Sequence, residues 1–513
     1  MRAPVHNVSR WITRRAELAG SDLALVDGAR RLDYAALEQR CARAAGLLAA
    51  AGVERGERVA LLLGNRSAAL EALLGAARLG AIAVPLNLRL AAPEIAELLA
   101  DCRPQVLLYE AELEALAAAS LAELAEPPRL CLAVGGAPDA WETGLAGARP
   151  CTQSAAVSPE DPMILLYTSG TTGTPKGALL PHRKTLFNSL NAQLFFELSR
   201  RDRVLVSVPL YHSFGLQILS LPALYVGARV VLQRHFDPEQ VWQQVEREAI
   251  TALGGVPTMY RALYEALEAR PRDLRSLRFG FTAGAAISVE LIHAFAARGL
   301  PLKQGFGQTE TSILCCLDTK DAIRKAGSVG RPVFHSELRI VRRDGLERSP
   351  DRWEDCPPGE TGEIVVRGPI TMLGYWERPE DTAQTLREGW LLTGDLGSFD
   401  PEGFVTLTGR SKELFISGGE NVYPRQVEAV YETHPAIREL AVVGVPDPRW
   451  GEVGRAYVVL EEGASLDPAA LERWGRERLA AFKVPRSFVA VAALPRTATG
   501  KVRKFQLEEA SRR

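Results

Sequence analysis

The stretch Tyr167-Thr168-Ser169-Gly170-Thr171-Thr172-Gly173-Thr174-Pro175-Lys176-Gly177 decides how the rest of the chain is organised. A short apolar run, Met163 to Leu166, comes directly before it and predicts a buried strand. Glycines let backbone N–H groups approach an anion closely, while the hydroxyls and Lys176 add donors and charge. The composition therefore predicts a phosphate-binding loop that follows a buried strand.

This loop differs from the common nucleotide-binding loop of ATPases. Lys176 is followed by Gly177, so the spacing G-x-x-x-x-G-K-[ST] is absent. A flexible surface loop is the alternative interpretation. It is less favoured because a bare linker has no need of a Pro-Lys-Gly ending after a buried strand.

Length and composition narrow the class of protein. A chain of 513 residues suggests more than one domain, at roughly 150 residues each. A hydrophobic content of 47% and a charged content of 24% are typical of soluble globular proteins. The net charge of -1 gives no electrostatic case for binding nucleic acid. The seven cysteines show neither C-x-x-C pairs nor His spacing, so neither zinc nor a disulfide framework is indicated and a cytoplasmic location is expected.

One segment is long enough to span a membrane. Residues 204–228 contain no Asp, Glu, Lys or Arg. Prolines and glycines interrupt the segment, however, which favours a buried strand, a loop, a helix and a second strand over a transmembrane helix. Residues 1–20 also lack the apolar core of a signal peptide.

The hydrophobic pattern predicts an α/β fold. Helical and strand patterns alternate over residues 8–125 and again over 163–281, which argues for mostly parallel sheets covered by helices. Residues 127–161 are rich in Pro, Gly, Ala and Ser and are predicted to be a connection. Between 327 and 408, strand-like runs separated by Gly turns predict a small antiparallel, barrel-like piece.

A domain boundary is expected near Gly409-Arg410-Ser411-Lys412. It divides the chain into a large N-terminal domain, residues 1–410, and a smaller α+β C-terminal domain, residues 411–513.

Several further stretches place polar groups after strands or at turns. They are Tyr211-His212-Ser213-Phe214-Gly215, Thr282-Ala283-Gly284-Ala285, Gly305-Phe306-Gly307-Gln308-Thr309-Glu310, Thr393-Gly394-Asp395, Ser417-Gly418-Gly419-Glu420-Asn421 and Thr499-Gly500-Lys501. Each alone is compatible with a capped turn. In this order, and together with YTSGTTGTPKG, GRSKELFISGGENVYP and PRTATGK, they resemble the adenylate-forming superfamily of acyl-CoA synthetases, adenylation domains and beetle luciferases over residues 10–505.

The resemblance implies a two-step reaction. A carboxylic acid attacks the α-phosphate of ATP, and the thiol of coenzyme A then displaces AMP from the acyl-adenylate. The residues implied in catalysis are Lys501, Glu310 and His212. Those implied in binding ATP and AMP are Thr168, Ser169, Gly170, Thr171, Thr172, Gly173, Lys176, Gly284, Ala285, Gly305, Phe306, Thr309, Asp395, Arg410 and Lys501.

The chemistry of these residues agrees with such roles. Glu310 and, by likeness to the family, Thr171 or Thr172 would hold Mg²⁺, because a hard cation prefers oxygen ligands. Asp395 would accept hydrogen bonds from the ribose hydroxyls, with Arg410 beside it. Lys501 would stabilise charge that builds between the carboxylate and the α-phosphate, which is worth roughly 10²–10³ in rate.

In the resembling family the C-terminal domain rotates between the two half-reactions. Lys412 corresponds to the hinge, where many relatives carry aspartate. One face of the domain would deliver Lys501, and the other would deliver the coenzyme A set, which is Ser417, Gly418, Gly419 and Trp450.

The acid is expected to be an unsubstituted acyl or aryl carboxylate, because the stretch around His212 lacks the aspartate that pairs with an amino acid's amine. The acyl pocket is predicted to contain His212, Phe214, Val256, Met259 and Ile313, which suits a fatty or aromatic tail. The chain looks most like bacterial fatty-acyl-CoA synthetases, so a medium- to long-chain fatty acid is the leading expectation. An aryl-CoA ligase of the coumarate or benzoate type, and an enzyme that loads a carrier protein, are the alternatives.

The sequence also bears on two other kinds of partner, a membrane surface and a second copy of the chain. Arginines at 200, 201 and 203 and at 10, 14 and 15 could form a peripheral membrane contact, and a solvated charged face is the competing interpretation. A homodimer is also considered, and no nucleic acid partner is expected.

Overall fold

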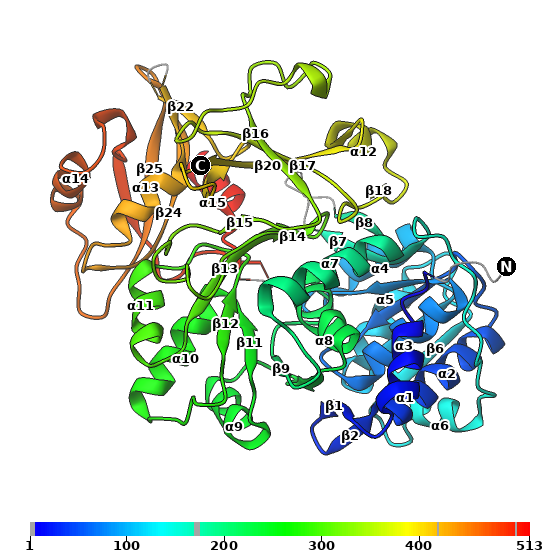
Figure 1. Cartoon of the computed structure of the whole chain (residues 1–513). Coiled ribbons are helices and arrows are strands. Elements are labelled where there is room, and N and C mark those ends of the chain that lie inside the picture. The colour runs from blue at the N-terminus through cyan, green and yellow to red at the C-terminus, as the bar shows by residue number, and fades with distance from the viewer. Residues whose placement is uncertain (1–5, 169–174, 418–419, 498–499, 513) are drawn as a thin grey trace.

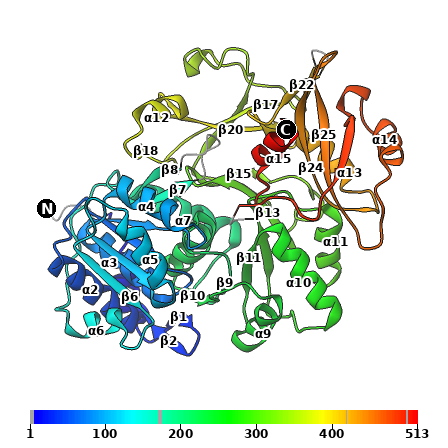
Figure 2. The ribbon, with the colours of Figure 1, turned by 180° about the vertical axis from the view of Figure 1, so that it is seen from behind.

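The computed structural model describes residues 6–168, 175–417, 420–497 and 500–512. Two large sheets with their helices form most of the N-terminal part, and two smaller sheets complete the molecule (Figures 1 and 2). The α/β fold class expected from the sequence is confirmed.

The first large sheet has seven strands in the order β18-β8-β7-β4-β3-β5-β6. Strands β3 to β7 run parallel, whereas β8 pairs antiparallel with β7 and places Lys176 opposite Thr168. The opening stretch thus connects two adjacent strands, although residues 169–174 lie outside the described residues. The strands are β3 (Arg58–Leu62), β4 (Ile82–Pro85), β5 (Val106–Glu110), β6 (Leu130–Val134), β7 (Pro162–Thr168), β8 (Lys176–Pro181) and β18 (Gly374–Tyr375).

Alanine-rich helices cover this sheet closely. In α3 every residue from Ser67 to Arg78 is buried. A side chain at Gly75 would lie 2.9 Å from the Cβ of Ala44, so small residues allow α2 and α3 to pack together. The helices are α1 (Arg10–Ala19), α2 (Tyr34–Ala50), α3 (Ser67–Leu79), α4 (Ala92–Cys102), the short η1 (Ala111–Leu113), α5 (Glu114–Ala122) and α6 (Ala140–Gly147).

The prediction that residues 127–161 form only a connection is wrong. The segment contains β6, which extends the sheet beside β5, and α6. Trp141 of α6 is buried, and its Nε1 donates to Glu71 at 3.1 Å. β6 is a short apolar run, LCLAV, at a partly buried edge of the sheet, and the Pro and Gly residues on either side of it are typical of a connection.

The second large sheet has nine strands in the order β15-β14-β13-β12-β11-β9-β10-β1-β2. Its six central strands are parallel, and β2, β14 and β15 add antiparallel edges. The strands are β1 (Leu23–Asp27), β2 (Arg30–Asp33), β9 (Arg203–Val206), β10 (Arg229–Leu232), β11 (Ala252–Gly255), β12 (Phe279–Thr282), β13 (Leu302–Gln308), β14 (Ser312–Cys316) and β15 (Arg331–Pro332). The helices are α7 (His182–Phe196), the π-helix η2 (Phe214–Ser220), α8 (Leu221–Val226), α9 (Pro238–Glu248), α10 (Pro257–Ala269) and α11 (Val289–Ala297).

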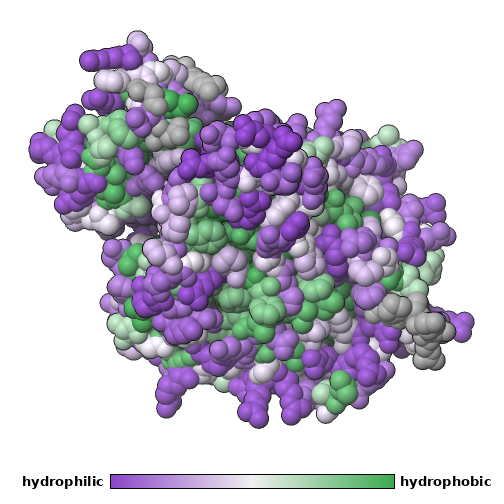
Figure 3. Space-filling view, turned by 45° about the horizontal axis from the view of Figure 1, so that its top comes forward, coloured by the Kyte–Doolittle hydropathy of each residue, from purple (hydrophilic) through white to green (hydrophobic). Residues whose placement is uncertain are grey.

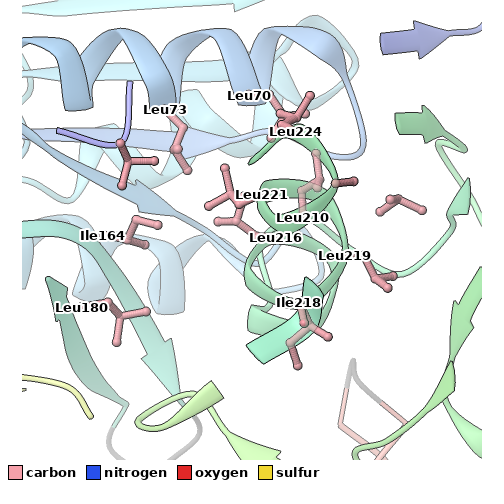
Figure 4. Packing of buried hydrophobic residues seen from close by; sticks show 14 of the residues in the cluster. Leu70, Leu73, Ile164, Leu180, Leu210, Leu216, Ile218, Leu219, Leu221 and Leu224 are labelled. Atoms are coloured by element: carbon pink, nitrogen blue, oxygen red, sulfur yellow. The ribbon is translucent and has the colours of Figure 1, made fainter. Parts of the chain in front are cut away.

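The uncharged segment 204–228 folds into β9, η2 and α8, as its prolines and glycines indicate. Figure 4 shows its leucines, Leu210 to Leu224, packed towards Leu70 and Leu73 of α3 and Ile164 of β7. This core joins the two large sheets, and burial of each such side chain stabilises the fold by about 1.5–3 kcal/mol. In the part of the chain that the structure describes, no helix has the length and apolar character needed to cross a membrane.

The third sheet is the predicted barrel-like piece. It is antiparallel, in the order β16-β17-β20-β19 with β21 paired to β20. Its elements are β16 (Glu337–Val341), η3 (Pro350–Arg352), β17 (Gly362–Arg367), α12 (Pro379–Thr385), β19 (Leu386–Arg387), β20 (Trp390–Phe399) and β21 (Val405–Arg410).

The fourth sheet belongs to the C-terminal domain, which projects from the rest of the surface (Figure 3). Its order is β23-β22-β25-β24, with β26 paired to β25. Its elements are β22 (Phe415–Ser417), β23 (Glu420–Val422), α13 (Pro424–Tyr431), β24 (Ile437–Asp447), β25 (Gly451–Leu460), α14 (Pro468–Arg476), η4 (Ala481–Lys483), β26 (Ser487–Ala490) and α15 (Lys504–Arg512).

Candidate active site

Several of the motifs come together where parallel strands end. The segments that contain His212, Ala283 and Gln308 follow or end β9, β12 and β13, which are members of one sheet. In open α/β sheets, ligands bind outside the carboxyl ends of the strands. The cleft at this edge is therefore the candidate active site.

Asp395 forms one wall of the cleft. It is buried, and Arg410 lies opposite it on the neighbouring strand, with Arg410 Nε 2.9 Å from its carboxylate. Gln308 Nε2 donates both to Asp395 and to the backbone oxygen of Thr393. A carboxylate held in this way keeps a fixed orientation and has oxygen lone pairs left to accept from hydroxyl donors.

The turn before Asp395 rests on a second buried carboxyl. Glu363 accepts a hydrogen bond from the Gly394 N–H at 2.8 Å, and Gly394 has φ +70°, a conformation that favours glycine. Burial raises the pKa of Glu363 to about 7, and the negative charge of Asp395 contributes. Glu363 therefore fixes the shape of the Thr393-Gly394-Asp395 turn.

Glu310 lies close to the end of the opening stretch. Its carboxylate accepts from the hydroxyl of Tyr375 at 2.9 Å, and Lys176 Nζ stands 5.5 Å from the Tyr375 ring. Lys176 also forms an ion pair with Asp381 of α12. The strand pair β8–β18 thus connects Lys176 with Glu310 through Tyr375.

The residues around Glu310 fit a magnesium–nucleotide complex. Among the described residues no group of three or more His, Cys, Asp or Glu side chains could hold a metal alone. Mg²⁺ commonly binds through one or two carboxylates together with substrate phosphates and water. The carboxylate of Glu310 could supply one ligand, whereas Thr171 lies outside the described residues.

A buried lysine supports the turn at residues 307–312, which contains Glu310. Lys184 of α7 is fully buried, and its Nζ donates to Ser312 Oγ. Burial lowers the pKa of Lys184 to about 7, although the nearby carboxylate of Glu310 opposes the shift. Ser312 has φ +60°, and its carbonyl oxygen would lie only 1.8 Å from a side chain at Gly307. The tight 307–312 turn thus depends on glycine and on this lysine contact.

His212 has a buried ring nitrogen and lies within the electrostatic influence of Lys501. Within the described chain, its buried Nε2 has no hydrogen-bond partner. Burial lowers the pKa of His212 to about 4, and the positive charge of Lys501 adds to the effect. His212 is therefore neutral at physiological pH and can offer a hydrogen bond.

Lys501 reaches the cleft from the C-terminal domain. Its loop docks against the start of α10, where a side chain at Gly500 would lie 3.5 Å from Thr258 Oγ1. Burial lowers the pKa of Lys501, as does the charge of Arg410, while Asp395 and Glu310 oppose the shift. The two domains are thus arranged with the Lys501 face directed into the N-terminal cleft.

The other predicted acyl-pocket residues are apolar, and they lie on η2, at the start of α10 and on β14. Phe214 opens the π-helix η2, and its ring packs edge-on against Phe281 of β12, with centroids 5.6 Å apart. Val256 and Met259 lie at the start of α10, and Ile313 lies on β14. Seven-residue π-helices are rare and occur often at functional sites, because they redirect side chains.

The remaining predicted residues fall into three groups. Gly305 and Phe306 are buried in β13, Thr309 is half-buried, and Gly284 and Ala285 are exposed after β12. In the coenzyme A set, Ser417 pairs with Gly451 beside the exposed Trp450, on a different edge of the C-terminal domain from Lys501. Ser169, Gly170, Thr171, Thr172 and Gly173, as well as Gly418 and Gly419, lie outside the described residues.

Sequence reasoning missed several residues of the cleft. Gln308 lies inside the motif GFGQTE, so the sequence places it near the site, but its contact with Asp395 could not be predicted. Tyr375, Asp381, Glu363 and Lys184 gave no local signal, since each reaches the cleft through contacts distant in the sequence.

Comparison with known proteins agrees with this geometry. The model of the AMP-binding enzyme family matches residues 12–376, and the model of the AMP-binding enzyme C-terminal domain matches residues 426–501. The chain is 41% identical to a feruloyl-CoA synthase from Amycolatopsis sp, with 97% of each chain covered. It is 42% identical to an indoleacetate–CoA ligase from Aromatoleum aromaticum and 34% identical to the long-chain-fatty-acid–CoA ligase FadD13 from Mycobacterium tuberculosis, with 98% of each chain covered in both cases.

Solved structures show the same architecture. The anthranilate CoA ligase AuaEII in complex with anthranoyl-AMP superposes with a TM-score of 0.90 at 30% identity, covering 98% of this chain and 97% of that one. ATP-bound MatB from Rhodopseudomonas palustris superposes with a TM-score of 0.89 at 30% identity, covering 99% of both chains. Family models and relatives thus agree over nearly the whole length, and the chain belongs to the AMP-binding enzyme family as an AMP-forming acid–thiol ligase.

Proposed function

We propose that this ligase activates an aromatic carboxylic acid with ATP and Mg²⁺ and transfers the acyl group to coenzyme A. The observation that carries the choice of acid is the aromatic packing around Phe214, a predicted acyl-pocket residue. The Phe214 ring lies against Phe281, which in turn packs against Phe196 with centroids 4.6 Å apart. A flat ring suits such an aromatic end wall, since aromatic pairs gain about 0.5–1.5 kcal/mol beyond area burial.

The region between Phe214 and Gly254 is also tightly packed. A side chain at Gly254 would lie 3.0 Å from the Phe214 ring and 2.7 Å from Leu219. An acyl group that extends past Phe214 towards Gly254 would therefore need Phe214 or Leu219 to move, which disfavours a long alkyl chain. The names of the relatives point the same way, since feruloyl and indoleacetyl groups are aromatic.

The first half-reaction joins the acid to AMP. The neutral His212 would hold the substrate carboxylate, and one of its oxygens attacks the α-phosphorus of ATP as the bond to pyrophosphate breaks. Lys501 would stabilise the charge on the α-phosphate oxygens, and Lys176 would bind the departing phosphates after it leaves Asp381. Asp395 would orient the ribose, and Arg410 would hold the Asp395 carboxylate in place.

Magnesium, when bound, would neutralise phosphate charge. Glu310 is the residue that would hold it, and Tyr375 orients that carboxylate through its hydroxyl.

The second half-reaction forms the thioester. The thiol of coenzyme A, as thiolate, attacks the carbonyl carbon of the adenylate, and AMP leaves. We propose that the C-terminal domain turns about Lys412 between the two steps, so that Ser417 and Trp450 replace Lys501 at the cleft. The domain boundary at residue 410 is part of this proposal.

A fatty acid remains a second candidate. The fatty-acid ligase FadD13 is 34% identical, against 41% and 42% for the relatives named for aromatic acids. The expected medium- to long-chain substrate is thus less well supported than the aryl alternative.

An acid panel tests the proposal. Purified protein would be given ATP, Mg²⁺ and single acids, including ferulate, indoleacetate, benzoate, octanoate and palmitate, and pyrophosphate release would be measured with and without coenzyme A. We expect the highest kcat/KM with aromatic acids and a thioester product confirmed by mass spectrometry. Higher kcat/KM with octanoate or palmitate would overturn the aryl proposal. Transfer to a carrier protein, without use of coenzyme A, would overturn the proposed acceptor.

A further inference from the structure

A basic pocket lies at the opposite edge of the second sheet from the active site. It is a cavity of about 450 Å³ between the β1–β2 turn, the starts of β9 and β10, and the end of α9. In Figure 1 these elements lie at the lower end of the molecule, and the C-terminal domain lies at the upper end. Its charged lining is Arg31, Arg203, Arg229, Arg247 and Glu248.

The charges in this pocket do not balance. Glu248 is the one carboxylate among the lining residues, and it is bound by Arg31 through two hydrogen bonds of 2.9 and 3.0 Å. Arg229 and Arg247 approach it only to 3.5 and 3.6 Å, which is beyond a good hydrogen bond. Three guanidinium groups therefore share one carboxylate and a fourth, that of Arg203, has none, so three positive charges remain.

A structural role explains only part of the cluster. Arg203 donates to the backbone oxygens of Glu248 and Ala249, where it satisfies the carboxyl end of α9. Arg31 is accounted for by Glu248. Arg229 is not, because its Nε is buried and has no hydrogen-bond partner within the described chain. Burial lowers the pKa of Arg229, and the charge of Arg203 lowers it further, so a bound anion would relieve both effects.

We propose that this pocket binds a phosphate group, carried by a small phosphorylated molecule or by a lipid headgroup. Planar guanidinium groups bind phosphate oxygens in pairs, and several converging arginines are typical of phosphate recognition. The volume falls within the range of ligand pockets, about 300–1,000 Å³, and so leaves room for more than the phosphate itself. The site goes beyond the proposed ligase function and does not depend on it.

The test measures binding of inorganic phosphate to the full-length protein by calorimetry, and each variant is compared with the wild type, so that any phosphate binding in the catalytic cleft is common to all of them. Arg247→Gln removes one cation, and it should weaken phosphate binding by about tenfold, because a charge-assisted hydrogen bond is lost. Glu248→Gln removes the competing carboxylate, and it should tighten binding severalfold. Arg200→Gln is the matched control, because Arg200 is exposed and does not line the pocket. None of the three should change ligase activity.

A parallel flotation assay identifies the source of the phosphate. Vesicles of phosphatidylcholine with phosphatidylglycerol should retain the wild type if a lipid headgroup is the ligand, and Arg247→Gln should release it. Saturable phosphate binding without flotation would support a small phosphorylated ligand in the same pocket. The proposal is overturned if neither probe binds, if Arg200→Gln matches Arg247→Gln, or if Glu248→Gln fails to tighten binding.

Discussion

Asp395 and Arg410 face each other across adjacent antiparallel strands. Their Cα atoms are register partners in β20 and β21, and Arg410 Nε lies 2.9 Å from the carboxylate. Gly394, at φ +70°, turns the chain just before this pair, and Gln308 holds the carboxylate from the neighbouring sheet. A pair built at such a junction has a fixed direction, which is what recognition of a sugar hydroxyl requires.

Removal of the Asp395 charge should weaken nucleotide binding. Asp395→Asn keeps the shape of the side chain but removes the negative charge that would accept hydrogen bonds from the two ribose hydroxyls. The Kd for AMP should therefore rise by about 10- to 100-fold. Calorimetric titration with AMP measures this. Asp355→Asn is a matched control, since Asp355 is an exposed partner of Arg339. An unchanged Kd in Asp395→Asn would contradict the assigned role.

Loss of Lys501 should separate the two half-reactions. Lys501→Ala should reduce adenylation by about 10²–10³ while thioester formation from supplied acyl-adenylate is kept, because the ammonium acts on the first transition state. Pyrophosphate release and thioester formation would be measured separately. Lys483→Ala, in the same domain and hydrogen-bonded to Gln426, is the control. If both half-reactions fell together, the division of roles would be wrong.

Motifs could be predicted from the sequence because each is local. The loop around Lys501 and the turn of Asp395 were identifiable as short runs, and the structure brings both to one cleft. Tyr375 could not be predicted, since it reaches Glu310 from 65 residues away, through a two-residue strand. The same holds for Lys184. It lies in a helix with no distinctive sequence, and only the structure shows that it contacts Ser312.

The fold shows the same limit. Central strands such as β3 are almost entirely apolar, and they lie within residues 8–125, where the sequence predicts alternating helices and strands. The edge strand β6 is a short apolar run, LCLAV, but it lies between Pro127-Pro128 and Gly135-Gly136, and such residues are typical of a connection. Local pattern therefore locates strands in long periodic segments, while a short strand among turn residues is recognised only beside its partner strand.

His182 should make the protein less stable in acid. Burial lowers its pKa from 6.5 to about 4, so between these values the unfolded state binds a proton that the folded state does not. The free energy of unfolding is thus unaffected by His182 above pH 6.5. It falls as the pH decreases towards 4, by about 2 kcal/mol at pH 5. Chemical denaturation of His182→Gln should show a correspondingly smaller loss between pH 8 and pH 5. The exposed His293→Gln should behave as the wild type, and an identical pH dependence in all three would refute this account.

Glu363 should have the opposite pH dependence. Burial raises its pKa from 4.5 to about 7, so the folded state binds the extra proton, and stability is lost as the pH rises from 4.5 through 7. Glu363→Gln keeps an acceptor for the Gly394 N–H and should stabilise the protein by up to about 3 kcal/mol at pH 8, but by less than about 1 kcal/mol at pH 5. Glu337→Gln, at an exposed pair with Arg367, serves as the control. Destabilisation of Glu363→Gln at pH 8 would show that the ionised carboxylate is needed.

Truncation of Phe214 should change the choice of acid. Its ring fills the space between Gly254 and Phe281, so Phe214→Ala should open the pocket end to acids with longer substituents. Each added methylene that finds room is worth about 1–3 kcal/mol, so kcat/KM for a long acid relative to benzoate should rise at least about tenfold. Tyr264→Ala removes a ring that packs edge-on against Phe295, remote from His212, and controls for lost packing. Equal losses for short and long acids in Phe214→Ala would mean that Phe214 supports the fold without limiting the substrate.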